Sequence, residues 1–139
     1  MLVDSQLERD TLELLIKCRD SLSKKYGLTY IIEKPLFDVG ADESETPREI
    51  CKPDFILRVQ GDGVKHPVIV IETMGSDSQR YRERKLRMHK LFERIENSPQ
   101  PIPVIEHDFC LSNDVKEVND RFCRQLYAKV LAGREREGV

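Results

Sequence analysis

The sequence predicts a single α/β domain over residues 1–139, with a mixed four-stranded sheet flanked by helices and a further helix at the C-terminal end. Three observations predict this class. Segments with helical spacing of apolar residues alternate with short β-branched runs, and two of these runs are joined by a glycine-rich turn. The length of 139 residues also suits one hydrophobic core. The expected order of elements is α, β, β, β, α, β, α.

The composition describes a charge-rich globular protein. Charged residues make up 35% of the chain and hydrophobic residues 39%, there is no tryptophan, and the formal net charge is -2. No apolar run approaches the length of a membrane span, and the opening segment, which includes DSQLERD, lacks the apolar centre of a signal peptide. We therefore expect a cytoplasmic location. The net charge gives no general sign of nucleic-acid binding, so the distribution of charge has to supply such evidence.

The four cysteines are scattered along the chain, and none lies in a CxxC pair. We therefore expect reduced, mostly structural thiols rather than a zinc ribbon or a sequence-local redox pair. One alternative stays open, because His107 and Cys110 form an HxxC pair that could begin a zinc site completed from Cys51 or Cys123. The simpler interpretation is the end of a strand followed by a buried thiol.

The first two elements are a long helix and a strand. Asp4–Tyr26 is predicted to be the helix, with Gly27 as its C-terminal stop and an inner face formed by Leu7, Thr11, Leu14, Leu15, Cys18 and Leu22. Leu28–Phe37 is predicted to be the first strand, in which Pro35 is tolerated only at an edge or an end. Asp38–Lys52 is acidic and turn-forming, which indicates an exposed loop.

A β-hairpin is predicted near the middle of the chain. The runs Phe55–Val59 and Val68–Thr73 are apolar and β-branched, and they flank the sequence Gly61, Asp62, Gly63. Glycine adopts positive φ angles easily, as a tight turn requires. The two runs are therefore expected to pair as antiparallel strands.

Three more elements follow the hairpin. Ser76 and Ser78 are capping candidates for a helix that runs to about Asn97, with an apolar stripe of Tyr81, Met88, Leu91, Phe92 and Ile95. Val104-Ile105 is predicted to be a short buried strand, parallel to its partner because a helical crossover precedes it. Ser112, Asn113 and Asp114 cap a last helix, whose inner face is Val115, Val118, Phe122, Leu126 and Val130.

Two carboxylates lie on the predicted hairpin. Asp54 follows Pro53 and opens the first strand, while Glu72 lies near the end of the second, behind the apolar run VIVI. Buried carboxylates are costly without a compensating charge, which favours a cation between the two. A Pro-Asp pair that opens one strand and a glutamate near the end of its hairpin partner resemble the metal-binding half of the PD-(D/E)XK nuclease pattern. The αβββαβ order of elements likewise resembles the restriction-endonuclease-like core.

This resemblance implies a metal site and its chemistry. In the resembled family, aspartate and glutamate hold one or two Mg²⁺ ions, or Mn²⁺, which bind the scissile phosphate and activate water. Asp54 and Glu72 match the motif acids, and Thr73 would provide its backbone carbonyl as the third ligand. The structural alternative is that Asp54 caps a turn and Glu72 pairs with an arginine of the following helix.

The lysine of the motif is missing. Residues two apart in a strand share a face, so a lysine at position 74 would stand beside Glu72, but this sequence has the uncharged Met74. On a helical wheel, Arg84 lies about 35° and Lys85 about 65° from the centre of the apolar stripe of the next helix. Branches of the resembled superfamily place the basic group on this helix. Lys85 first and Arg84 second are therefore predicted to replace the strand lysine.

Further polar residues are assigned by the same resemblance. Family members often add an acid from the first helix to the metal ligands, and Glu8, about 65° from the apolar centre, is the better-placed candidate. The basic run RYRERKLRMHK is predicted to contact DNA phosphates through Arg80, Arg82, Arg87 and Lys90. The plainer interpretation is that these charges form solvated helix faces.

The leading hypothesis is metal-dependent hydrolysis of DNA phosphodiester bonds. The alternative, favoured by Met74, is a catalytically degenerate domain that binds DNA or docks within a larger mobile-element protein, and a purely structural interaction domain is a third. The segments IIEKPLF, PDF, ETMG, YRERKLRMH and HDF also resemble a domain found in proteins of conjugative plasmids and integrative elements. The sequence leaves open whether the chain forms a homodimer or belongs to a larger parent protein.

Overall fold

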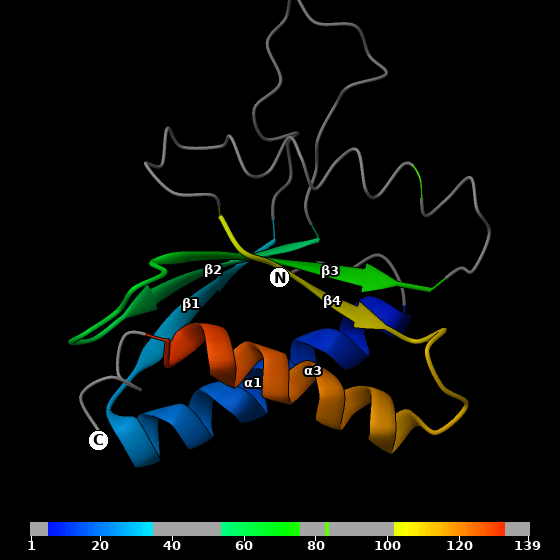
Figure 1. The fold of residues 1–139 in the computed structure, drawn as a ribbon, viewed down its shortest axis with the longest axis horizontal. Coiled ribbons are helices and arrows are strands. Elements are labelled where there is room, and N and C mark those ends of the chain that lie inside the picture. The colour runs from blue at the N-terminus through cyan, green and yellow to red at the C-terminus, as the bar shows by residue number, and fades with distance from the viewer. Residues whose placement is uncertain (1–5, 35–53, 76–82, 84–101, 133–139) are drawn as a thin grey trace, which may run out of the picture.

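The computed structural model describes residues 6–34, 54–75, 83 and 102–132 (Figure 1). Within these ranges the elements follow the expected order: α1 (Gln6–Tyr26), β1 (Thr29–Glu33), β2 (Phe55–Gln60), β3 (Val68–Met74), β4 (Val104–Asp108) and α3 (Val115–Val130). The acidic loop lies outside the part of the chain that the structure describes, and so does the helix predicted from Ser76 to about Asn97, apart from Glu83, which is helical. None of the described helices is long and apolar enough to cross a membrane.

The four strands form one mixed sheet in the order β1-β2-β3-β4. Strand β2 pairs antiparallel with both β1 and β3, and β3 pairs parallel with β4. The predicted hairpin and the predicted parallel strand are therefore both confirmed. Strand β4 is longer than the predicted Val104-Ile105, because Glu106, His107 and Asp108 continue it. Polar residues hid this extension, since a strand is recognised in sequence by its apolar pattern.

Helices α1 and α3 lie side by side on the same face of the sheet (Figure 1). Alternate strand residues point to this face, and they form one core cluster with the helices that includes Tyr30, Ile32, Phe55, Leu57, Val59, Ile69, Ile71 and Ile105. The intervening residues point to the opposite face. There Ile56, Val70, Glu72 and Met74 are buried as well, so the central strands are covered on both sides.

The inner faces of the two helices follow the predicted spacing, with two exceptions. Helix α1 buries Glu8 in addition to the expected Thr11, Leu15, Cys18 and Leu22. Helix α3 buries Val118, Phe122, Leu126 and Val130, whereas Val115, predicted on the same face, is 59% exposed. Val115 is the first residue of the helix, directly after the N-cap Asp114, so the helix reaches the core only one turn later.

The turn between β2 and β3 depends on glycine, as predicted. Gly61 has a φ of 139°, and a Cβ atom at this position would lie 2.2 Å from Cδ2 of the buried Leu28. We expect Gly61→Ala to lower the free energy of unfolding by about 1–3 kcal/mol, because the backbone is strained and Leu28 has to move.

Urea unfolding measures the loss. The control is Gly27→Asn, because Gly27 has a φ of 67° with open space around it, and asparagine tolerates this conformation. Equal losses in both variants would contradict the crowding argument.

Candidate functional site

Asp54 and Glu72 meet at the end of the hairpin where β2 begins and β3 ends. Phe55 of β2 is opposite Ile71 of β3, so the next pair in the antiparallel register is Asp54 and Glu72, with side chains on the same side of the sheet. The backbone N–H of Asp54 donates to Oε1 of Glu72 over 3.0 Å. The backbone N–H of Thr73 donates to Oδ2 of Asp54 over 2.8 Å. Each carboxylate is thus fixed against the backbone of the other strand.

The two carboxylates differ in burial. Glu72 is fully buried, at 0% exposure, and Asp54 is half-buried. Removing a carboxylate from water costs free energy unless hydrogen bonds or a positive charge compensate. The two backbone hydrogen bonds supply part of this compensation. Two neighbouring carboxylates removed from water are also a place where a cation would be stabilising.

The donor set fits a hard divalent cation in type. Carboxylate oxygens suit Mg²⁺ and Mn²⁺, and Mg²⁺ is commonly bound by only one or two carboxylates, with water and substrate phosphate completing its shell. Among the described residues, no group of three or more histidine, cysteine, aspartate or glutamate side chains is arranged to hold a metal. Asp54 and Glu72 would therefore act as a two-carboxylate site.

The backbone N–H of Thr73 contacts Asp54, whereas the Thr73 side chain lies on the face of the sheet opposite the two carboxylates. The Thr73 hydroxyl lies 3.1 Å from the hydroxyl of Thr11 on α1. The use of its backbone carbonyl as a metal ligand stays a prediction. Next along β3, Met74 is 2% exposed and its carbonyl accepts a hydrogen bond of 3.0 Å from the backbone of Phe109. The position at which the motif has lysine is thus occupied by a buried apolar side chain.

The predicted basic residues are not placed by the structure. Lys85 and Arg84, the two replacements for the motif lysine, lie outside the described residues, as do the predicted phosphate contacts Arg80, Arg82, Arg87 and Lys90. Their roles therefore stay predictions.

Glu8 is buried and forms an ion pair with Lys34, at the residue after β1. The side chains of Glu8 and Lys34 are only 9% and 6% exposed, and the Lys34 Nζ lies 5.2 Å from the centre of the Phe55 ring. This places Glu8 on the helix-covered face, close to the start of β2. Sequence reasoning missed Lys34, although a signal was present. Tyr30, Ile32 and Lys34 alternate along one strand, so the lysine occupies a core-facing position.

A buried hydrogen-bond network joins both helices to the end of the sheet. Nδ1 of His107 lies 2.7 Å from the Thr11 hydroxyl, and Nε2 lies 2.8 Å from Oδ1 of Asn119 on α3. Because Oδ1 is an acceptor, Nε2 carries the proton. The Thr11 hydroxyl, which lies against Nδ1, also donates to the backbone carbonyl of Leu7 over 3.0 Å. His107 is fully buried and both of its ring nitrogens have protein partners, while Cys110 is exposed. The alternative of an HxxC zinc site therefore finds no support in this geometry.

The network makes stability depend on pH. Burial lowers the pKa of His107, against smaller raising effects of the hydrogen bond to Asn119 and the charge of Asp10. The unfolded chain, with an ordinary histidine pKa of about 6.5, therefore binds a proton that the folded state resists. The contribution of His107 to stability is present above about pH 6.5 and is lost as the pH falls below it. We expect His107→Gln to remove this part of the pH dependence.

Urea unfolding between pH 5 and pH 8 measures this effect. The wild-type protein should lose up to about 1 kcal/mol more than His107→Gln over this range. His66→Gln is the control, because the pKa of His66 is also lowered by burial, but this residue is only half-buried. A His107→Gln protein with the wild-type pH slope would show that another group is responsible.

Comparisons with known proteins give a family and one curated relative. Residues 4–128 match a family model described as "Restriction endonuclease-like C-terminal domain". The chain is also similar to the Escherichia coli protein named "Uncharacterized protein in cib 5'region", with 36% identity over 94 residues. This match covers 67% of the chain and 43% of the relative, so the chain spans less than half the length of that protein. No solved structure matches the chain.

Proposed function

The chain belongs to the family of restriction endonuclease-like C-terminal domains, and from this premise we propose that it is a metal-dependent nuclease domain that hydrolyses DNA phosphodiester bonds. The observation that supports the proposal most is the meeting of Asp54 and Glu72, whose carboxylates are each hydrogen-bonded to the backbone of the other strand. Two carboxylates held in this way suit Mg²⁺ or Mn²⁺. The proposed partner is therefore DNA.

In this proposal the protein positions the cation through Asp54, Glu72 and the carbonyl of Thr73. A bound divalent cation would supply positive charge to the scissile phosphate and lower the pKa of a water molecule. Glu8, which is ion-paired with Lys34 on the helix-covered face, would have to leave that face to join the ligands on the opposite side of the sheet. The short backbone hydrogen bonds keep the two carboxylates in place before DNA arrives, which limits reorganisation during the reaction.

The basic group is proposed to come from the segment after β3, since Met74 cannot provide it. Lys85 is the first candidate, because a lysine can give or take a proton when burial lowers its pKa. Arg84 is the second, and it would stabilise charge without acting as a base. Arg80, Arg82, Arg87 and Lys90 are proposed to contact DNA phosphates, which adds a salt-dependent contribution to affinity.

Cleavage of supercoiled plasmid by the purified protein tests this function. We expect nicked and linear products in Mg²⁺ or Mn²⁺, and none after addition of EDTA, because the carboxylates alone cannot activate water. Asp62→Ala serves as the control for substitutions of Asp54 and Glu72, since Asp62 lies in the same hairpin but is exposed in its turn. The Asp62→Ala protein should cleave as the wild type does. Absence of cleavage by the wild-type protein with both metals would count decisively against the proposal.

Met74 favours a second candidate function, a degenerate domain that binds DNA or docks within a larger protein without cutting. The buried side chain of Met74 can neither carry charge nor transfer a proton. This candidate predicts no Mn²⁺ binding by calorimetry, together with DNA binding whose affinity falls steeply with salt. Mn²⁺ binding that Asp54→Ala abolishes would instead favour the nuclease.

A further inference from the structure

Two cysteines far apart in the sequence are brought together between the helices. Sγ of Cys18 on α1 lies 3.4 Å from Sγ of Cys123 on α3, across a separation of 105 residues. Cys18 is buried and Cys123 is half-buried, while Cys110, the third cysteine within the described residues, is exposed in the segment before α3. Both helices pack on the same face of the sheet (Figure 1), and this packing holds the two sulfur atoms in contact.

The surroundings favour the thiolate on Cys18 and the protonated thiol on Cys123. The two sulfur atoms share one hydrogen bond, which the Cys123 thiol donates when Cys18 is the thiolate, and the Tyr127 hydroxyl donates a second to Cys18. These donors lower the pKa of Cys18 to about 7, although burial acts in the opposite direction. The same hydrogen bond raises the pKa of Cys123. One sulfur of the pair is therefore nucleophilic near neutral pH, and its neighbour holds a proton.

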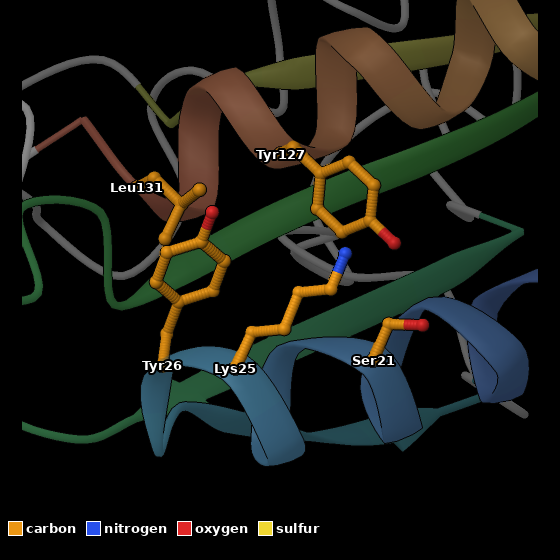
Figure 2. A pocket seen from close by; sticks show the side chains of 5 residues that line it. All are labelled: Ser21, Lys25, Tyr26, Tyr127 and Leu131. Carbon is orange, nitrogen blue, oxygen red and sulfur yellow. The ribbon is translucent and has the colours of Figure 1, made fainter.

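A pocket adjoins this pair through Tyr127, which lines it and is hydrogen-bonded to Cys18. Figure 2 shows it between the C-terminal ends of α1 and α3, lined by Ser21, Lys25, Tyr26, Tyr127 and Leu131. Its volume is about 170 Å³. In Figure 2 the Tyr127 ring reaches from α3 toward α1. Its hydroxyl accepts a hydrogen bond from Ser21 and donates to Cys18. The wall of the pocket is thus in direct contact with the reactive sulfur.

We infer that Cys18 and Cys123 are a site of reversible oxidation by hydroperoxides, in which an intramolecular disulfide joins α1 to α3. The Cys18 thiolate attacks the terminal oxygen of the hydroperoxide, the O–O bond breaks, and the leaving hydroxide or alkoxide takes a proton from solvent to become water or an alcohol. The resulting sulfenic acid is attacked by the sulfur of Cys123. The S–O bond breaks, and the hydroxyl leaves as water with the Cys123 proton. The two sulfur atoms together lose two electrons, and the peroxide gains them.

Peptide mapping of the full chain after treatment with hydrogen peroxide tests this inference. We expect linked peptides that contain Cys18 and Cys123, a loss of two thiols from the four in the chain, and restoration of both by dithiothreitol. The disulfide closes a loop of about 100 residues, so the oxidised protein should melt at least about 5 °C higher. The rate of thiol loss should be half-maximal near pH 7, the pKa of Cys18.

Matched variants separate this pair from the other thiols. Cys18→Ser and Cys123→Ser should lose the linked peptides, whereas Cys110→Ser should keep them. Tyr127→Phe should slow the oxidation several-fold, because it removes a donor to the Cys18 sulfur, while Tyr26→Phe in the same pocket should not. Oxidation confined to Cys110 or Cys51, or disulfide-linked dimers in place of the internal bond, would overturn the inference. The wild-type peptide map decides the matter even if Cys18→Ser fails to fold.

Discussion

Asp54→Asn and Glu72→Gln are each expected to reduce metal-dependent DNA cleavage by at least about 100-fold. Loss of residues that only support a metal ligand already costs about 10- to 100-fold in affinity or activity, so loss of a ligand should cost more. Both substitutions keep an oxygen that can accept the observed backbone hydrogen bond, from Thr73 N in one case and Asp54 N in the other. The loss would therefore reflect charge rather than a disrupted hairpin.

Stability separates this interpretation from simple unfolding. Glu72→Gln replaces a fully buried carboxylate with a neutral amide. Without metal, the free energy of unfolding of this variant should therefore be equal to that of the wild type or up to about 1 kcal/mol higher. Mn²⁺ should raise the melting temperature of the wild type, because it binds the folded state, and should leave both variants unchanged. Asp62→Asn, in the exposed turn, is the matched control and should behave as the wild type. Wild-type cleavage by either variant would contradict the two-carboxylate site.

Glu8→Ala is expected to lower the free energy of unfolding by about 3–5 kcal/mol. Its partner Lys34 has a side chain that is only 6% exposed, so the substitution leaves a buried ammonium group without this carboxylate. The contact of the Lys34 Nζ with the Phe55 ring, at 5.2 Å, is weaker than an ion pair and compensates only part of the loss. Urea unfolding at neutral pH measures the effect. The double variant Glu8→Leu with Lys34→Met, which replaces the pair with apolar side chains, should recover most of it.

The ion pair between Arg58 and Glu33 provides the control for this prediction. Its atoms are 2.8 Å apart, but its side chains are 40% and 41% exposed, so Glu33→Ala should cost less than about 1 kcal/mol. Similar losses in Glu8→Ala and Glu33→Ala would show that the burial of the first pair has no energetic consequence. A Glu8→Gln protein of wild-type stability that no longer binds Mn²⁺ would instead support Glu8 as a metal ligand.

The sequence predicted the features that follow from local pattern. The two apolar, β-branched runs with glycines between them predicted the antiparallel pairing of β2 and β3, and the register of that pairing places Asp54 opposite Glu72. The missed features depend on partners distant in the sequence. Lys34 is stable in the interior because Glu8 reaches it from another element, and His107 is accommodated in β4 because Thr11, 96 residues earlier, provides a hydroxyl. Polarity alone could not show that these residues are interior.

Thr73 takes part in both faces of the sheet, because its N–H holds Asp54 while its hydroxyl lies against Thr11. A small rotation of α1 would pull on that hydroxyl and turn the peptide group that anchors the aspartate. The spacing of the two acids is therefore sensitive to the helical layer behind them. Substitutions on α1 that do not contact the carboxylates should still alter the affinity of the proposed site for a divalent cation.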